Sequence, residues 1–327
     1  MSLARFICKR ILEIVVTLFI IATLIFLLFR LMPGDPLAAL INPKWTAEIK
    51  EMMRIRFGLD GPLWKQYLVY MRNLLNGDFG ISFYWQGDVI DILKPRILPT
   101  MLLFTVGTLL AYALGINIGR IIAWKRGSSL EYGSTVTGLF FHAMPIFWLG
   151  LLAIWIFSWK FDLFPIGGMK SPEIWSQSGS SLSIRILDVA YHLFLPLTVF
   201  TVWVFTTSML IMKNSMLETI KEDYIVTARA KGLTEKKIRD HHAARNAMLP
   251  VVTSLSLAMA FSFNGGVLTE RTFSWPGLGS VLVDASLRYD YPVAQGAFIL
   301  LAAVVLVAVL CADIIYAYLD PRISYDR

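Results

Sequence analysis

The sequence ILEIVVTLFIIATLIFLLF (Ile11–Phe29) decides the fold class of this chain. It is an almost purely apolar run of 19 residues, and a helix needs about 20 such residues to cross a hydrocarbon core of ~30 Å. Arg5, Lys9 and Arg10 precede it, as basic residues precede the apolar part of a signal peptide. That part has only about 7–15 residues and ends at small residues, whereas this run is longer and ends in a charged residue. We therefore expect a retained membrane helix.

The rest of the chain repeats this pattern. Of its 327 residues, 56% are hydrophobic and only 16% are charged, whereas a soluble domain carries about 25% charged residues. The sequence therefore excludes a soluble protein and predicts an all-α integral membrane protein with six membrane-spanning helices. The five further apolar runs are Thr100–Trp124, Thr137–Trp159, Tyr191–Met212, Leu249–Leu268 and Val293–Tyr318.

Basic residues in the short connections indicate the orientation, because cytoplasmic loops carry an excess of lysine and arginine. These residues gather before the first run, at Lys125 and Arg126 after the second run, and along the connection after the fourth run. Alternation of the spans then places both termini in the cytoplasm. The formal net charge of +7 follows from these loops, so it gives no reason to expect a nucleic acid as a partner.

Composition predicts two parts of the chain. Residues 1–94 combine the first helix with an extracytoplasmic segment that is rich in turn-forming residues, and residues 95–320 form a five-helix body. Within the outer segment, Leu63–Leu75 is predicted to form a helix whose apolar side chains lie broadly on one face. We expect the segment Pro33–Ile97 to fold over the outer mouth of the protein.

No pattern of catalytic, metal-binding or nucleotide-binding residues is present in the sequence. It has no phosphate-binding P-loop, no glycine-rich dinucleotide motif and no zinc motif. Cys8 and Cys311 lie far apart and give no argument for a disulfide. The ionisable residues that we identify in the apolar runs are Glu13, His142 and Asp313, and we expect structural roles for them. The sequence therefore predicts a protein that is not an enzyme, with no catalytic residues and no metal site.

The connection 213–250, which we call the elbow, is the most unusual part of the chain. Ala228 and Ala230 favour a short helix, and Gly232 can end that helix because glycine adopts the left-handed conformation without a steric penalty. Thr234 can cap a second helix. The small residues leave room for another backbone or side chain to approach closely, and Leu233 is expected to pack back against the spans. A solvated loop with helical propensity is the alternative.

At this point the sequence resembles a known family. Glu222–Leu233, followed by Arg245–Pro250, closely resembles the cytoplasmic EAA loop of binding-protein-dependent ABC importers, in the permeases of the dipeptide, oligopeptide and nickel subgroup. Val226 and Thr227 stand where the general pattern has glutamate and alanine, as is usual in that subgroup. Further segments that resemble the subgroup are Phe57–Leu63, Gly77–Gly80, Met144–Gly150, Phe273–Gly279 and Asp290–Pro292.

The resemblance implies a fold and a set of partners. The fold would be that of a type I ABC importer permease, and the long outer segment is similar to that of the first of the two permease subunits. The chain would form half of the translocation pathway together with a second homologous permease subunit. Two cytoplasmic ATPase subunits would bind ATP and Mg²⁺, and an extracytoplasmic solute-binding protein would deliver the ligand. The outer segment would help to seat that protein or close the outer gate.

The resemblance also implies where the protein is located and which residues couple it to the ATPases. The chain would be a multi-pass protein of a plasma membrane, either a bacterial inner membrane or an archaeal membrane. The resemblance assigns coupling to the ATPases to residues of the elbow, namely Glu222, Asp223, Tyr224, Thr227, Ala228, Ala230 and Gly232.

The sequence gives weaker signals for the translocation pathway and for the substrate. Ser262, Asn264, Gly265 and Gly266 supply small and polar surface that would line a water-filled route, although small residues at helix–helix contacts have the same composition. Di- and oligopeptides are the leading substrates by subgroup, while nickel chelates, glutathione and short oligosaccharides stay open. An ion-coupled secondary carrier is the alternative of a different class, and it would need buried acids or discontinuous helices in two repeats.

Overall fold

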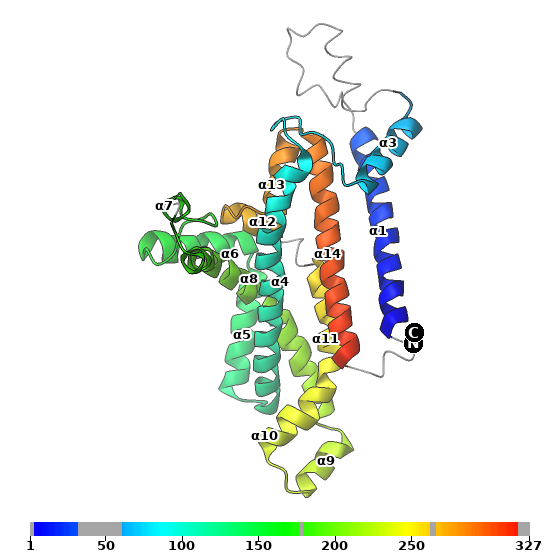
Figure 1. Ribbon diagram of the computed structural model, residues 1–327. Coiled ribbons are helices and arrows are strands. Elements are labelled where there is room, and N and C mark those ends of the chain that lie inside the picture. The colour runs from blue at the N-terminus through cyan, green and yellow to red at the C-terminus, as the bar shows by residue number, and fades with distance from the viewer. Residues whose placement is uncertain (1–2, 32–60, 177–178, 262–265, 320–327) are drawn as a thin grey trace. The chain divides into compact units, whose positions relative to one another are not determined.

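The computed structural model describes residues 3–31, 61–176, 179–261 and 266–319 (Figure 1). These residues form helices joined by turns and loops. The one strand-like pairing among them is an isolated antiparallel bridge between Ile81 and Asp88. The predicted all-helical class is therefore confirmed for the described part of the chain.

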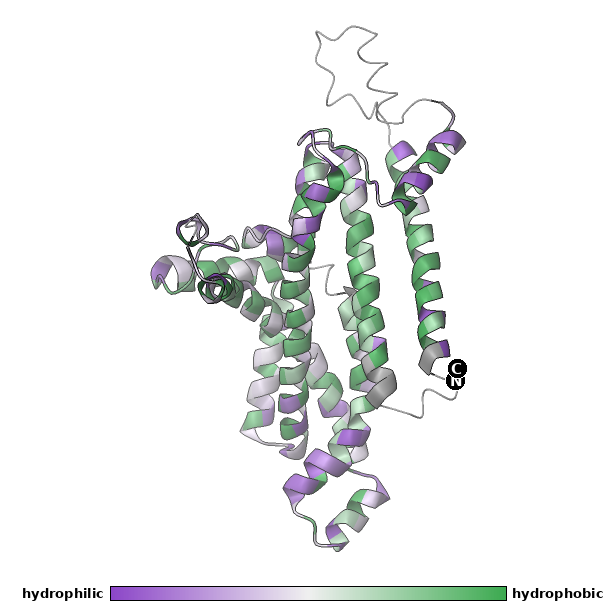
Figure 2. Cartoon of the chain, in the orientation of Figure 1, coloured by the Kyte–Doolittle hydropathy of each residue, from purple (hydrophilic) through white to green (hydrophobic). Residues whose placement is uncertain are grey.

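Four of the described helices are long and apolar enough to cross a membrane, as Figure 2 illustrates by their hydropathy. Each contains one of the predicted spans and extends beyond it at one end or at both. The predicted total of six spans stays a prediction. The four helices are α1 (Leu3–Leu31), α4 (Val89–Trp124), α8 (Leu182–Thr219) and α14 (Tyr291–Leu319).

The predicted uninterrupted helix Thr137–Trp159 is wrong. The chain forms α5 (Ser129–Ala143) and then α6 (Ile146–Ala153), which continues as the π-helical segment η1 (Ile154–Lys160), and the two parts are bent by 101°. Met144 between them is extended, with φ −78° and ψ 140°. The following proline explains this conformation, because its ring disfavours helical geometry in the preceding residue.

The predicted fifth span, Leu249–Leu268, falls on two helices, α11 (Ala244–Phe261) and α12 (Gly266–Thr272). Helix α11 directly continues a helical stretch that begins at Glu235, so the second helix of the elbow and this span form one helical path. Pro250 lies inside α11 and does not interrupt this path.

The chain divides into two compact units. The first unit contains residues 1–100 together with 276–307, and the second contains residues 101–275 together with 308–326. The first unit includes α3 (Leu63–Leu75), which has the bounds predicted from the sequence, and α13 (Leu278–Leu287). The predicted division at residue 94 did not pair residues 276–307 with the N-terminal part.

A buried carboxylate organises the first unit. Asp290, which precedes α14, is fully buried. It accepts hydrogen bonds from the Ser82 hydroxyl and from the backbone N–H groups of Phe83 and Tyr84, at 3.1 and 3.0 Å. Hydrogen bonds to an ionised group are stronger than neutral ones. They therefore hold the loop that precedes α4 against the start of α14.

In the second unit, α4 approaches α8 through a row of small residues. A Cβ atom added to Gly115 would overlap the Ser208 hydroxyl and would lie 2.7 Å from the Phe205 carbonyl oxygen. At Gly119 it would lie 2.6 Å from the Met209 carbonyl oxygen. Glycines four residues apart let two helix backbones come this close in a membrane protein. This close contact was not predicted from the sequence.

The ionisable residues of the apolar runs have local partners. Glu13 pairs with the Arg10 guanidinium at 3.2 Å. His142 Nδ1 lies 2.9 Å from the Trp203 carbonyl oxygen, and Asp313 accepts a hydrogen bond from a serine hydroxyl at 3.2 Å. These contacts agree with the structural roles expected for the three residues.

Candidate functional site

The elbow consists of two helical arms joined by a tight turn, at the end of the bundle formed by α4, α5, α8 and α11 (Figure 1). The first arm is α9 (Asp223–Ala230). The second arm starts with α10 (Glu235–Lys237), continues through the π-helical segment η2 (Ile238–Ala243) and runs into α11. The predicted helix–turn–helix is therefore confirmed.

The turn between the arms depends on a glycine. Gly232 has φ +74°, and its N–H donates to the Arg229 carbonyl oxygen at 2.9 Å. The Leu233 N–H reaches back to the Ala228 carbonyl oxygen at 3.4 Å, which is the hydrogen-bond pattern that closes a helix at a left-handed residue. The Thr234 hydroxyl then caps the second arm by accepting from the Lys237 N–H at 3.4 Å.

Replacing Gly232 with valine is expected to destabilise the elbow by ~1–3 kcal/mol, the cost of a strained backbone conformation. An added Cβ would meet no atom within 4 Å, so the effect isolates the backbone. Gly232→Asn is the matched control, because asparagine tolerates the left-handed region. The measurement is the thermal unfolding of the purified permease. Equal melting temperatures for the two variants would show that the positive φ does not matter.

The inner face of α9 is fixed by a buried apolar cluster, which we call the elbow core. Ile225 is completely buried and Ala228 is only 5% exposed. Leu233 packs against the same cluster, so its predicted packing against the spans is confirmed. Four elements, α4, α8, η2 and α11, supply the other buried members, and these are Tyr112, Ala123, Met212, Met216, Ile238, Ala243, Ala244, Ala247 and Val251.

The outer face of α9 is exposed. Val226 is 60% exposed, and Ala230 lies on the side of the helix opposite the elbow core. Among the residues to which the resemblance assigns coupling, Ala228 differs from the others. It packs into the chain's own elbow core and does not face solvent. The remaining six are exposed, and these are Glu222, Asp223, Tyr224, Thr227, Ala230 and Gly232.

Two polar contacts join the arms. Asn246 Nδ2 on α11 donates to the Tyr224 hydroxyl at 2.7 Å. The Arg229 guanidinium pairs with Glu235 at 2.9 Å, and it also lies over the Trp124 ring, 5.7 Å from the ring centre. Exposed ion pairs contribute about 1 kcal/mol or less. The elbow core is therefore expected to provide most of the rigidity, and these contacts add a second connection between the arms.

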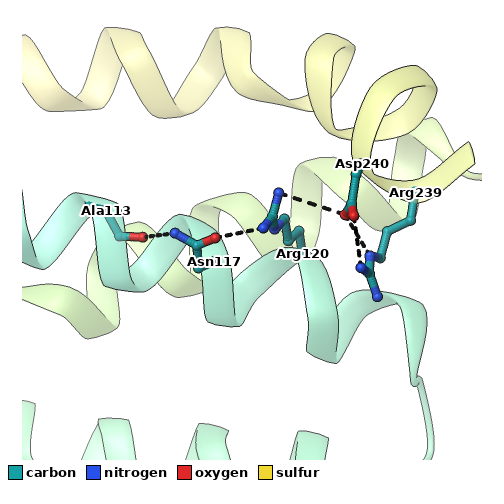
Figure 3. A network of polar contacts seen from close by, with 5 residues as sticks. All are labelled: Ala113, Asn117, Arg120, Arg239 and Asp240. Atoms are coloured by element: carbon teal, nitrogen blue, oxygen red, sulfur yellow. Dashed lines mark hydrogen bonds and ion pairs between the residues drawn. The ribbon is translucent and has the colours of Figure 1, made fainter. Parts of the chain in front are cut away.

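A second polar network ties the elbow to α4, as Figure 3 shows. Arg239 donates two hydrogen bonds to the Asp240 carboxylate, at 2.7 and 2.9 Å. Arg120 of α4 lies 3.7 Å from the same carboxylate and donates to Asn117 at 2.7 Å. Asn117 in turn donates to the Ala113 carbonyl oxygen. A chain of contacts thus runs from η2 along one face of α4.

This network stays charged at neutral pH. The hydrogen bonds from Arg239 hold the pKa of the Asp240 carboxyl below its usual range, against the opposing effect of partial burial, and the Arg120 charge adds to the lowering. A lowered carboxyl pKa means that the stabilisation is present above the ordinary value near 4 and is lost only as the pH falls through the folded-state value. This network was not predicted from the sequence, although Arg120 within a predicted span was a signal for it.

Most of the predicted pathway residues lie outside the described part of the chain. Ser262, Asn264 and Gly265 precede the start of α12 and belong to that undescribed stretch. Gly266 is buried, and a Cβ added there would lie 2.5 Å from the Phe104 ring. Gly266 therefore makes a close packing contact, and the pathway role of the four residues stays a prediction.

Comparison with known proteins agrees with this architecture. The model of the family "Binding-protein-dependent transport system inner membrane component" matches residues 115–325, and the model of its N-terminal region matches residues 3–104. The oligopeptide transport system permease protein AppB of Bacillus subtilis is 35% identical, over 99% of this chain and 100% of its own length.

Two other relatives are similar over nearly their whole length. The dipeptide transport system permease protein DppB of Escherichia coli K12 is 35% identical over 99% of both chains. The glutathione transport system permease protein GsiC of Shigella boydii is 34% identical over 98% of this chain and 99% of its own. With an elbow built on a buried core and a family match over most of its length, the chain belongs to the family of binding-protein-dependent transport system inner membrane components.

Proposed function

We propose that this chain is the first of two permease subunits in an ATP-driven importer of di- or oligopeptides, and that its elbow is the site where an ATPase subunit docks. The observation that carries this proposal is the two-sided character of α9. Its inner face is locked into the elbow core, while its outer face is exposed and presents small and apolar side chains around Ala230 and Val226. A helix with these properties is suited to sit in the groove of a partner.

In this proposal the elbow works as a rigid lever. ATP and Mg²⁺ bind to the two partner ATPases, and movement of those subunits displaces α9. The elbow core passes the displacement to α8 and α11, and the Asp240–Arg120 pair passes it to α4. Rigid-body motion of packed helices is a common way to switch between two states. ATP binding then shifts the population between inward-open and outward-open forms.

The proposed topology is that of a type I ABC importer permease with six spans and both termini in the cytoplasm of a bacterial or archaeal cell. The bent pair of α5 and α6 with η1 would be the third span, and α11 with α12 the fifth. The basic residues of the elbow support its position inside the cell. The segment after α1 would then lie outside, where the solute-binding protein delivers the ligand.

Peptides are the proposed substrates because relatives named for oligopeptide and dipeptide transport match nearly the whole chain. A glutathione permease is almost equally similar, so γ-linked peptides belong among the compounds to be tested. Uptake by reconstituted importer should require both ATP and the solute-binding protein. Uptake driven by an ion gradient alone would point to a secondary carrier instead.

The test of the docking site is Ala230→Glu in the complete importer. Ala230 is exposed, so the permease should fold normally, but the longer charged side chain should keep an ATPase from closing on α9. A lost hot-spot contact of about 2 kcal/mol or more corresponds to a loss of at least ~30-fold. The measurements are peptide uptake into proteoliposomes and the stimulation of ATP hydrolysis by loaded binding protein.

Ala230→Ser is the matched control for this test, because it adds one small polar atom and no charge. It is expected to retain both activities. Normal uptake and normal stimulation by the Ala230→Glu importer would mean that α9 does not dock to the ATPase through this face.

A further inference from the structure

Helix α3 lies against the last turns of α1, at the end of α1 that is farther from the N-terminus (Figure 1). The Tyr67 hydroxyl is 2.8 Å from the Thr23 hydroxyl. The Phe26 ring contacts the rings of Tyr67 and Tyr70, each with a centroid distance of 5.3 Å. One face of α3 is therefore fixed to α1.

These contacts fix the depth of α3 in the membrane. Thr23 and Phe26 belong to the apolar run Ile11–Phe29, which is about as long as a hydrocarbon core is thick. At a rise of 1.5 Å per residue, Thr23 lies ~9 Å inside the end of that run. On the same stretch of α1, Leu24 and Leu28 are 60% and 58% exposed. Tyr67 and Tyr70 of α3 therefore contact α1 at the depth of the acyl chains and not in open water.

The exposed side of α3 carries an apolar stripe. Trp64, Leu68 and Leu75 are 66%, 59% and 83% exposed, and their spacing of four and seven residues places them on one side of the helix. Lys65 and Arg72 lie next to this stripe, again seven residues apart. Figure 2 shows this mixture of apolar and polar residues on α3 beside the apolar α1.

We propose that α3 is an interfacial helix that binds phospholipid. The stripe of Trp64, Leu68 and Leu75 inserts among the acyl chains and continues the apolar surface of α1. Arg72 and Lys65 lie at the level of the lipid phosphates. Tryptophan is enriched at membrane–water interfaces, and long basic side chains extend from apolar depth towards the head groups. Helices with an apolar face and a basic edge lie in the plane of the membrane surface.

The inference is tested with nitroxide labels in the complete importer, reconstituted in bilayers of phosphatidylethanolamine and phosphatidylglycerol. Cys8 and Cys311, both exposed, are replaced by serine, and single cysteines are placed at Leu68, at Leu75 and, as a control, at Asn76. Labels at 68 and 75 should collide with oxygen more often than with a water-soluble nickel chelate. The label at 76, just beyond the helix, should show the opposite preference.

Two outcomes would overturn the lipid contact. Frequent collision of both stripe labels with the nickel chelate would place the stripe in water. Protection of both labels from oxygen and from the nickel chelate would mean that a protein surface covers the stripe. If one of the two stripe variants does not assemble, the label on the other is enough to decide the test.

The phosphate contact has its own test. Arg72→Glu should move the label at position 68 to a different depth, while Arg72→Lys should leave the depth unchanged. An unchanged depth in Arg72→Glu would refute the contact between Arg72 and the lipid phosphates. Neither labelling result depends on the elbow or on the transported substrate, so a failure here leaves the proposed function intact.

Discussion

Gly115→Val is expected to prevent the permease from folding into a stable importer subunit. The first added atom would already overlap the Ser208 hydroxyl and lie 2.7–2.8 Å from backbone atoms of Phe205 and Met209 on α8. Backbone atoms cannot move aside as the tip of a flexible side chain can, so α4 and α8 must separate along their contact. Overpacking costs about 1–3 kcal/mol in cores that adapt and more where they cannot. Here the cost is expected to exceed ~3 kcal/mol.

The measurement is the yield of monodisperse complex after solubilisation, together with its melting temperature. Gly133→Val is the matched control, because Gly133 also lies in an apolar helix, α5, but a Cβ there would meet nothing within 4 Å. That variant should assemble normally. A Gly115→Val complex with a normal yield and melting temperature would show that the close contact between α4 and α8 is not needed.

Ala228→Glu is expected to have the second largest effect, through the stability of the elbow. The new carboxylate would be placed in the elbow core, where Ile225 and Ile238 are completely buried. Burial of an ion without a partner costs several kcal/mol. In proteins of 150–250 residues, 1 kcal/mol corresponds to about 2–4 °C. We therefore expect the melting temperature to fall by at least ~5 °C and peptide uptake to be lost.

The matched control for Ala228→Glu is Ala230→Glu, because it makes the same substitution two residues later on the exposed side of α9. Ala230→Glu should keep the wild-type melting temperature while losing transport. The pair thus separates the internal role of α9 from its proposed role in docking. Equal melting temperatures for the two variants would mean that α9 is not held by the elbow core.

The elbow shows how far local signals in a sequence can be trusted. The short helix, its end at Gly232 and the cap at Thr234 were all predicted, and the structure confirms each of them. Each depends on residues within a few positions along the chain, so the sequence contains the whole cause. The orientation of Ala228 was not predicted, because it depends on α8 and α11 packing against α9.

Proline shows where such signals fail. Prolines at positions 95, 99, 196 and 250 lie inside helices that continue through them, whereas the chain bends by 101° beside Pro145. Each of these prolines lacks a backbone N–H group, so the proline alone does not explain the difference. Whether a helix bends or continues depends on the neighbours that satisfy the freed backbone groups, as is common in membrane proteins. Hydropathy predicted an apolar span around residue 145 but could not predict its break.

The sequence by itself determined the class of this protein, because the length and apolar character of its runs leave a membrane as the only suitable solvent. It also determined the helices of the elbow and of α3, whose signals are local. Only the tertiary structure decided which residues meet across the chain, such as Asp240 with Arg120, Asp290 with Ser82, and Gly115 with Ser208. The partners in each pair lie more than 90 residues apart. Their contact depends on how closely whole helices and loops pack, which no local pattern of residues specifies.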